Sequence, residues 1–183
     1  MFCISCGKKL NDNYNFCIYC GYNLRDNKPR KYTTSFNVAG ITYENRQNII
    51  KKIVESAIKD EMIIPYGGMT NKEIKESGEN IFEIEYFKPD KVRLEPATYD
   101  NKPAIEVYIT YDDKEYMIGY VPKKMLKEIT DFLQKTEENK DYKLTCDAYF
   151  TGGKVKEIDY TTETLVTKEL NYGLDITLNI ERQ

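Results

Sequence analysis

Residues 2–10, Phe-Cys-Ile-Ser-Cys-Gly-Lys-Lys-Leu, return at residues 16–24 as Phe-Cys-Ile-Tyr-Cys-Gly-Tyr-Asn-Leu. Six of the nine paired positions are identical, so the two stretches form an internal repeat. Each copy is a Cys-x-x-Cys-Gly knuckle, whose two thiolates can bind one metal ion from a tight turn while the Gly supplies the positive φ. The repeat therefore predicts one closed, tetrahedral metal site with four ligands: Cys3, Cys6, Cys17 and Cys20.

A closed site of four thiolates favours one structural Zn²⁺ ion and indicates architecture rather than catalysis. Iron in a rubredoxin-like site uses similar knuckles and is the minority interpretation. A pair of disulfides is disfavoured because nothing in the sequence looks secreted. Zinc binding supplies on the order of 10–16 kcal/mol, which a module of so few residues needs because it has almost no core.

Composition predicts a cytoplasmic protein with one ordinary domain and a small appendage. The chain has 183 residues, 40% of them hydrophobic, and no stretch approaches the roughly 18 apolar residues of a membrane span. Met1 leads straight into the first knuckle, so we expect no signal peptide. Cys146 stands in an apolar alternation and is interpreted as a core residue. The richness in Ile, Lys, Asn and Tyr is typical of a low-GC bacterium or its mobile elements.

Charge is distributed unevenly along the chain. Residues 1–34 carry six Lys/Arg and two Asp/Glu, which leaves 21 Lys/Arg and 28 Asp/Glu, a net charge of −7, for residues 35–183. A body this acidic is a poor non-specific binder of nucleic acid. Any contact with nucleic acid is therefore expected to be local and to depend on shape.

The absence of histidine removes Ser-His-Asp and Cys-His catalysis and the usual general base near neutral pH. The Gly pairs at residues 67–68 and 152–153 lack the flanking pattern of a phosphate-binding loop and are interpreted as tight turns. We therefore expect a protein that is not an enzyme.

The pattern of apolar residues predicts an α+β body. We expect a polar linker at 25–34, a helix capped by Asn45, a short helix opened by a capping box at Thr70–Glu73, and a later helix begun by Pro122. Expected strands cover residues 35–43, 81–87, 91–94, 104–111, 115–120 and 174–180, with a hairpin of 144–150 and 155–160 around Gly152-Gly153. Together they predict a small, curved antiparallel β-barrel with two or three peripheral helices.

An ordered set of motifs in the body resembles the HIRAN domain. The set contains Phe36-Asn37-Val38-Ala39-Gly40-Ile41-Thr42-Tyr43, Leu94-Glu95-Pro96, Tyr99-Asp100, Ala104-Ile105-Glu106-Val107 and Ile118-Gly119-Tyr120-Val121-Pro122-Lys123. The resemblance is carried by motifs within residues 35–135, is taken to extend to about residue 180, and includes a helical insertion at about 45–88. The knuckles resemble the short zinc ribbons that are often fused to bacterial modules.

The resemblance implies a pocket for the exposed 3′ end of single-stranded DNA. Matched by motif, Tyr43 would be a pocket aromatic, Tyr99 and Asp100 would stack on and hydrogen-bond the terminal nucleotide, and Lys123 would meet phosphate. Tyr120 is also counted in this set, although it departs from the helicase-fused form, which has an imidazole at this position. The structural alternatives are strand-surface packing for Tyr43 and Tyr120, a turn for Tyr99-Asp100, and a solvated helix start for Lys123.

Three units follow: a zinc ribbon at 1–24, a linker at 25–34, and a HIRAN-like β-barrel domain at 35–183. The leading hypothesis is a non-catalytic module that binds nucleic acid, recognising a single-stranded DNA end or distorted DNA. The alternative is a protein–protein adaptor that uses the ribbon or the barrel surface, which the acidic body favours.

Overall fold

The computed structural model describes residues 2–3, 5–11, 14–24, 32–138, 140 and 142–182. Residues 32–182 form a mixed α+β body with antiparallel sheets, preceded by the ribbon. Its elements are β1 (Tyr32–Asn37), α1 (Glu44–Lys59), the 3₁₀ turn η1 (Pro65–Gly68), α2 (Asn71–Ser77), β2 (Ile81–Phe82), β3 (Lys91–Tyr99), β4 (Lys102–Tyr111), β5 (Lys114–Tyr120), the 3₁₀ turn η2 (Lys123–Met125), α3 (Leu126–Glu138), β6 (Tyr142–Asp159) and β7 (Thr164–Arg182).

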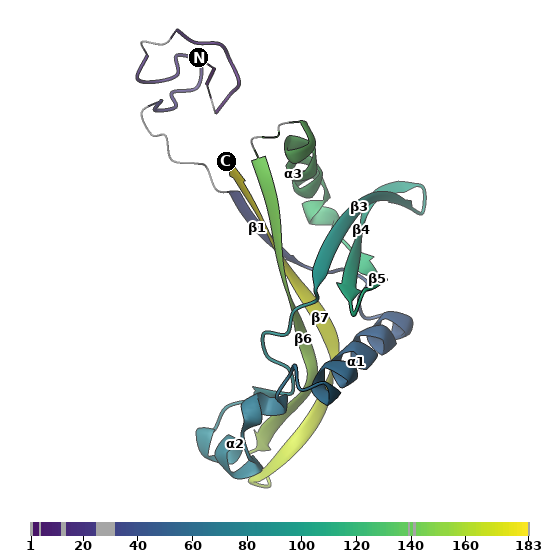
Figure 1. The fold of residues 1–183 in the computed structure, drawn as a ribbon. Coiled ribbons are helices and arrows are strands. Elements are labelled where there is room, and N and C mark those ends of the chain that lie inside the picture. Colours follow the sequence, from purple (N-terminus) through teal and green to yellow (C-terminus); the bar gives the residue numbers. More distant parts are fainter. Residues whose placement is uncertain are drawn as a thin grey trace.

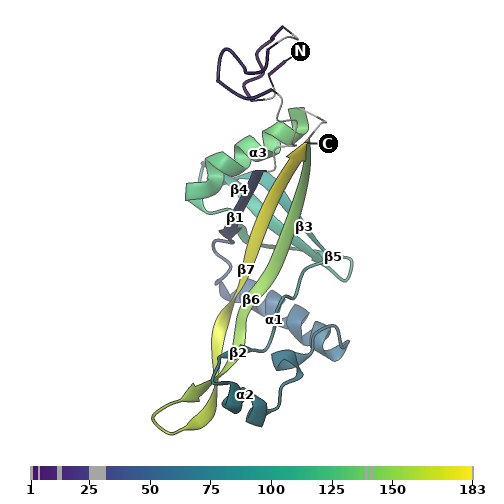
Figure 2. The same cartoon turned by 90° about the vertical axis from the view of Figure 1, so that its left-hand side faces the viewer.

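The described strands form two sheets, ordered β1-β7-β6-β2 and β3-β4-β5. The long β6–β7 hairpin runs the length of the body, and the three-stranded sheet packs beside its upper half (Figures 1 and 2). The sheets meet at one corner, where Ala39 and Tyr120 exchange backbone hydrogen bonds of 2.8 and 2.9 Å. Pairing among the described strands continues no further, so the expected barrel is replaced by two sheets linked through this bridge.

The hydrophobic core lies between the two sheets and is covered by α1 and α3. The first helix is present as predicted, and its apolar side chains at 50, 53, 54 and 57 are buried. The helix begins at Glu44 with Tyr43 as its N-cap, so the expected cap at Asn45 is wrong by two residues. Cys146 is half-buried against this core, and burial raises the pKa of its thiol to about 12.

The hairpin expected around Gly152-Gly153 is wrong, because β6 continues through both glycines and turns back only after Asp159. The two glycines have φ values of 80° and 76°, as a tight turn would require, but they lie at a register shift. Opposite them, β7 supplies an extra residue between Leu170 and Gly173 and forms a bulge. A Cβ atom on Gly152 would lie 2.1 Å from the carbonyl oxygen of Asn171.

Beyond the bulge, residues 153–170 form an extension of the hairpin that we call the distal arm. The segment expected to be an insertion supplies α1, η1, α2 and β2, and β2 pairs with the arm through Ile81 and Phe82. Thr70 and Glu73 form the predicted capping box, and Gly78 ends α2 with φ of 70°. No helix among the described residues is long and apolar enough to cross a membrane.

β1 begins at Tyr32, so the last three residues of the predicted linker belong to a strand. Residues 25–31 of that linker lie outside the described residues.

Candidate functional site

The four ribbon cysteines converge, as the repeat predicts. Their sulfur atoms all lie within 4.8 Å of one another, and two pairs, Cys3–Cys20 and Cys6–Cys17, are 3.6 Å apart. Four sulfurs about 2.3 Å from one zinc ion in a tetrahedron stand about 3.8 Å apart. The described cluster therefore fits one structural zinc ion with all four positions filled by protein.

Local backbone geometry builds each half of this site in the same way. Gly7 and Gly21 have φ of 72° and 71°, and each donates its N–H to the carbonyl of the first cysteine of its knuckle at 2.8 Å. The N–H of Ser5 donates to Cys3 Sγ at 3.3 Å. Despite a backbone hydrogen bond from Lys8, desolvation and the neighbouring sulfurs raise the pKa of the Cys6 thiol to about 12. Hydrogen bonds, the strongest of them from the backbone of Tyr22, lower the pKa of the Cys20 thiol to about 6. Such donors favour thiolates, which are the forms that bind zinc.

Four of the five predicted pocket residues line one cavity of about 210 Å³: Tyr99, Asp100, Tyr120 and Lys123. It opens at the turn between β3 and β4, beside η2, and the rings of Tyr99 and Tyr120 lie 5.2 Å apart, centroid to centroid. This volume is below the roughly 300–1,000 Å³ of a small-molecule pocket. The cavity is therefore smaller than the usual site for a whole small molecule.

Tyr43 does not line the cavity, but it is connected to it through Arg46, which sequence reasoning missed. The guanidinium of Arg46 lies 5.4 Å from the ring centroid of Tyr43 and 5.2 Å from that of Tyr120. It also donates to the carbonyl of Gly40 at 2.6 Å, which fixes it at this corner. The spacing of Tyr43 and Arg46 across the first turn of α1 was visible in the sequence, but the contact with Tyr120 depends on the fold.

The turn at the cavity mouth explains why Asp100 stands where it does. Asp100 and Asn101 have φ of 51° and 56°, the values of a two-residue type I′ hairpin turn, which Asp and Asn tolerate better than most residues. The next residue, Lys102, lines the cavity and was also missed. Arg46, Lys102 and Lys123 against Asp100 give this corner a local charge of +2 within an acidic body.

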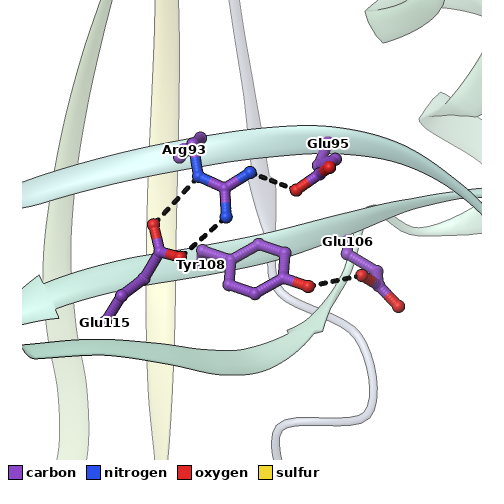
Figure 3. Close-up of polar contacts among 5 residues, drawn as sticks. All are labelled: Arg93, Glu95, Glu106, Tyr108 and Glu115. Carbon is purple, nitrogen blue, oxygen red and sulfur yellow. Dashed lines mark hydrogen bonds and ion pairs between the residues drawn. The ribbon is translucent and has the colours of Figure 1, made fainter.

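An acidic network covers the solvent face of the three-stranded sheet (Figure 3). Glu95 and Glu106 are directly opposite one another on β3 and β4, an arrangement that repels. Arg93 pairs with Glu95, and the hydroxyl of Tyr108 donates to Glu106 at 2.7 Å. Arg93 also clamps Glu115 with two hydrogen bonds of 2.9 and 2.7 Å.

Most charged and polar groups of this network find their partners within the network itself. The Arg93 guanidinium lies 4.2 Å from the ring centroid of Tyr108 and lowers the pKa of Glu115 through its hydrogen bonds. The hydrogen bond to Glu106 raises the pKa of Tyr108. Three carboxylates with one guanidinium leave a net charge of −2, on the same face of the sheet as Tyr99 and Tyr120.

Comparison with known proteins supports the ribbon. No curated protein and no solved structure matches the chain. The HIRAN resemblance of the body therefore rests on its motifs. Residues 2–24 match the family model of the zinc-ribbon domain, and with the four converging cysteines they are a zinc ribbon.

Proposed function

We propose that the chain is a non-catalytic binding module whose HIRAN-like body holds the 3′ end of a single DNA strand in the cavity beside Tyr99. One observation carries the proposal: Tyr99 and Asp100 from one part of the chain and Tyr120 and Lys123 from another line a single cavity. Ala39 and Tyr120, which the corner bridge joins, both line this cavity.

The chemistry of the cavity suits a terminal nucleotide. A base stacked on an exposed tyrosine ring gains about 1–3 kcal/mol. Asp100 can accept a hydrogen bond from a terminal hydroxyl, and Lys102 and Lys123 offer charge to one or two phosphates. The acidic network on the same sheet face repels phosphates, so the strand is expected to leave on the side of η2, where Lys123 and Lys124 lie.

The proposal is tested by titrating short labelled single strands that end in a free 3′ hydroxyl or a 3′ phosphate, at low and at physiological salt. We expect tighter binding of the free hydroxyl. Asp100→Asn keeps a residue that tolerates the turn and should remove that preference. Tyr99→Ala should weaken binding by about 1–3 kcal/mol, while Lys123→Ala should weaken all sequences alike.

The control is Tyr160→Ala, which removes a tyrosine that is more exposed than Tyr99 from the turn of the distal arm. It should leave binding unchanged. The absence of any end-dependent signal at low salt would refute the proposal.

The second candidate function is a protein–protein adaptor. The observation that favours it is a group of exposed apolar side chains on the small ribbon: Phe2, Phe16, Ile18 and Tyr19. Several exposed large apolar side chains on so small a unit are typical of interaction surfaces. On this alternative, no strand binds, and Phe2→Ser with Phe16→Ser abolishes partner capture while zinc binding is kept.

A further inference from the structure

We propose that the distal arm is a self-association surface, at which β7 of one chain pairs with β7 of a second copy along residues 164–170. The proposal is independent of the DNA-binding cavity. It rests on an open sheet edge whose sequence is complementary to itself.

The outer edge of β7 is covered over its body half and open over the arm. From Asp175 to Ile180 it pairs with β1. At Tyr172 the side-chain amide of Gln47 takes the place of a strand, accepting from the backbone N–H at 2.7 Å and donating to the backbone carbonyl at 2.9 Å. Among the described strands, none pairs with the outer edge of residues 164–170. Figure 2 shows this part of β7 at the margin of the molecule, away from α2.

The hydrogen-bonding groups on this edge can be assigned from the other side of the arm. The N–H of Glu83 donates to the carbonyl of Lys154, so the backbone of Lys154 points toward β2. Lys154 is opposite Glu169, whose backbone N–H and carbonyl therefore point away from β6, to the open edge. Because backbone groups alternate in direction along a strand, the N–H and carbonyl groups of Thr167 and Leu165 also point to the open edge.

Open edges are usually protected by proline, by charged side chains, above all lysine, or by bulges. Thr164–Leu170 contains no proline, and it begins with the β-favouring run Thr-Leu-Val-Thr. Its two charges are already neutralised within the chain, because Lys168 pairs with Glu157 and Glu169 lies 3.5 Å from Lys51. This edge therefore has no proline, and both of its charges have a partner within the chain.

The occupant is a second copy of the chain, because in one antiparallel register residues 164–170 of two copies pair along the whole edge without like charges opposite each other. Centred on Thr167, this register sets Thr167 against its own copy, Val166 against Lys168, and Leu165 against Glu169, with no like charges opposite. Moving the centre to Val166 sets Glu163 against Glu169, and moving it to Lys168 sets two lysines opposite each other. Cross-strand pairs of like charge are unfavourable, so the register is specified. The resulting pair has two-fold symmetry.

The test is the mass of the full zinc-loaded chain in solution as a function of concentration. We expect a transition to twice the 21.5 kDa of one chain. Thr167→Pro removes an N–H that faces the open edge and none that faces β6, and Thr167→Lys sets two lysines across the two-fold axis. Each should weaken association at least tenfold with an unchanged far-UV spectrum, whereas Thr167→Val should associate like the parent.

The register is tested by cross-linking. In a Thr167→Cys variant, the two thiols belong to a directly opposed pair with Cα atoms about 5.5 Å apart, within reach of a disulfide. In the control, Glu169→Cys, the two copies lie about 13 Å apart along the strands. Mild oxidation should link only the first. A chain that is monomeric at all concentrations, a dimer that tolerates Thr167→Pro and Thr167→Lys, or equal linking of both variants would overturn the proposal.

Discussion

Two separate features require glycine at position 152. Its φ of 80° costs other residues about 1–2 kcal/mol. An added Cβ would also meet the backbone oxygen of Asn171, an atom that cannot rotate away. We therefore expect Gly152→Ala to lower the free energy of unfolding by about 3 kcal/mol in urea titrations.

The matched control is Gly78→Ala at the end of α2. Its φ is 70°, but no other atom lies within 4 Å of the added Cβ, so only the backbone conformation is penalised. We expect a loss of about 1 kcal/mol. Equal losses for the two variants would show that the contact with Asn171 is unimportant.

The ion pair of Glu115 should make the free energy of unfolding fall as the pH is lowered. Because Arg93 lowers the pKa of Glu115, the folded chain binds that proton less readily than the unfolded chain. The pair therefore stabilises the fold above the unfolded pKa of about 4.3, and the stabilisation is lost as the pH falls through the folded value. We expect Glu115→Gln to lower the urea midpoint slightly at about pH 7, because the pair is half-exposed, and to leave it unchanged at about pH 2.

Glu163→Gln removes the same charge from the exposed turn of the arm and serves as the control. A midpoint that falls equally for both variants at neutral pH would assign the effect to net charge rather than to Arg93.

At the scale of elements, the ribbon and the body have separate cores. The ribbon core contains Cys3, Leu10 and Cys17, and none of these residues belongs to the core of the body. We expect elemental analysis to find one zinc per chain. Chelation, or Cys17→Ser, should unfold the ribbon and leave the thermal transition of the body in place. One cooperative loss of all structure would contradict this independence.

Elements with local signals could be predicted from the sequence, whereas elements set by distant partners could not. The box of Thr70 and Glu73 lies within one helical turn, and the tight turn at Asp112 and Asp113 joins β4 directly to β5. Gly152-Gly153 has the same backbone signature as a turn. Only its partner on β7, about twenty residues later, turns it into a bulge inside a long strand.

The candidate cavity follows the same rule. Tyr99 and Asp100 were identifiable because they belong to an ordered set of motifs, and the cysteines because they repeat. Arg46 could not be identified in this way. Its contact with Tyr120 joins positions 74 apart in the chain, and no local sequence pattern indicates such a contact.

At the scale of the whole molecule, the cavity has a local charge of +2, whereas residues 35–183 as a whole have a net charge of −7. With one or two phosphates neutralised, the logarithm of the DNA association constant should fall with that of salt concentration with a slope of about −1. Arg46→Ala should weaken binding, and Arg46→Lys should restore it only in part, because an ammonium group cannot stack on two rings as a planar guanidinium does. Titrations at several salt concentrations measure both effects. A steep slope, or full recovery with lysine, would place the bound strand elsewhere.

The bulge beside Gly152 also separates the distal arm, whose strands can change in length, from the body, whose strands cannot. The register of the body is fixed by the pairing of β7 with β1, on one side of the bulge, and β2 holds the arm only as far as Lys156. Beyond that point, each strand can gain or lose residues without moving the core. Strand side chains alternate between the two faces of a sheet. Such changes therefore leave each side chain of the arm on its own face only when each strand gains or loses residues in steps of two. Homologous chains should therefore differ in arm length by even numbers on each strand, a pattern that an alignment of their sequences would reveal.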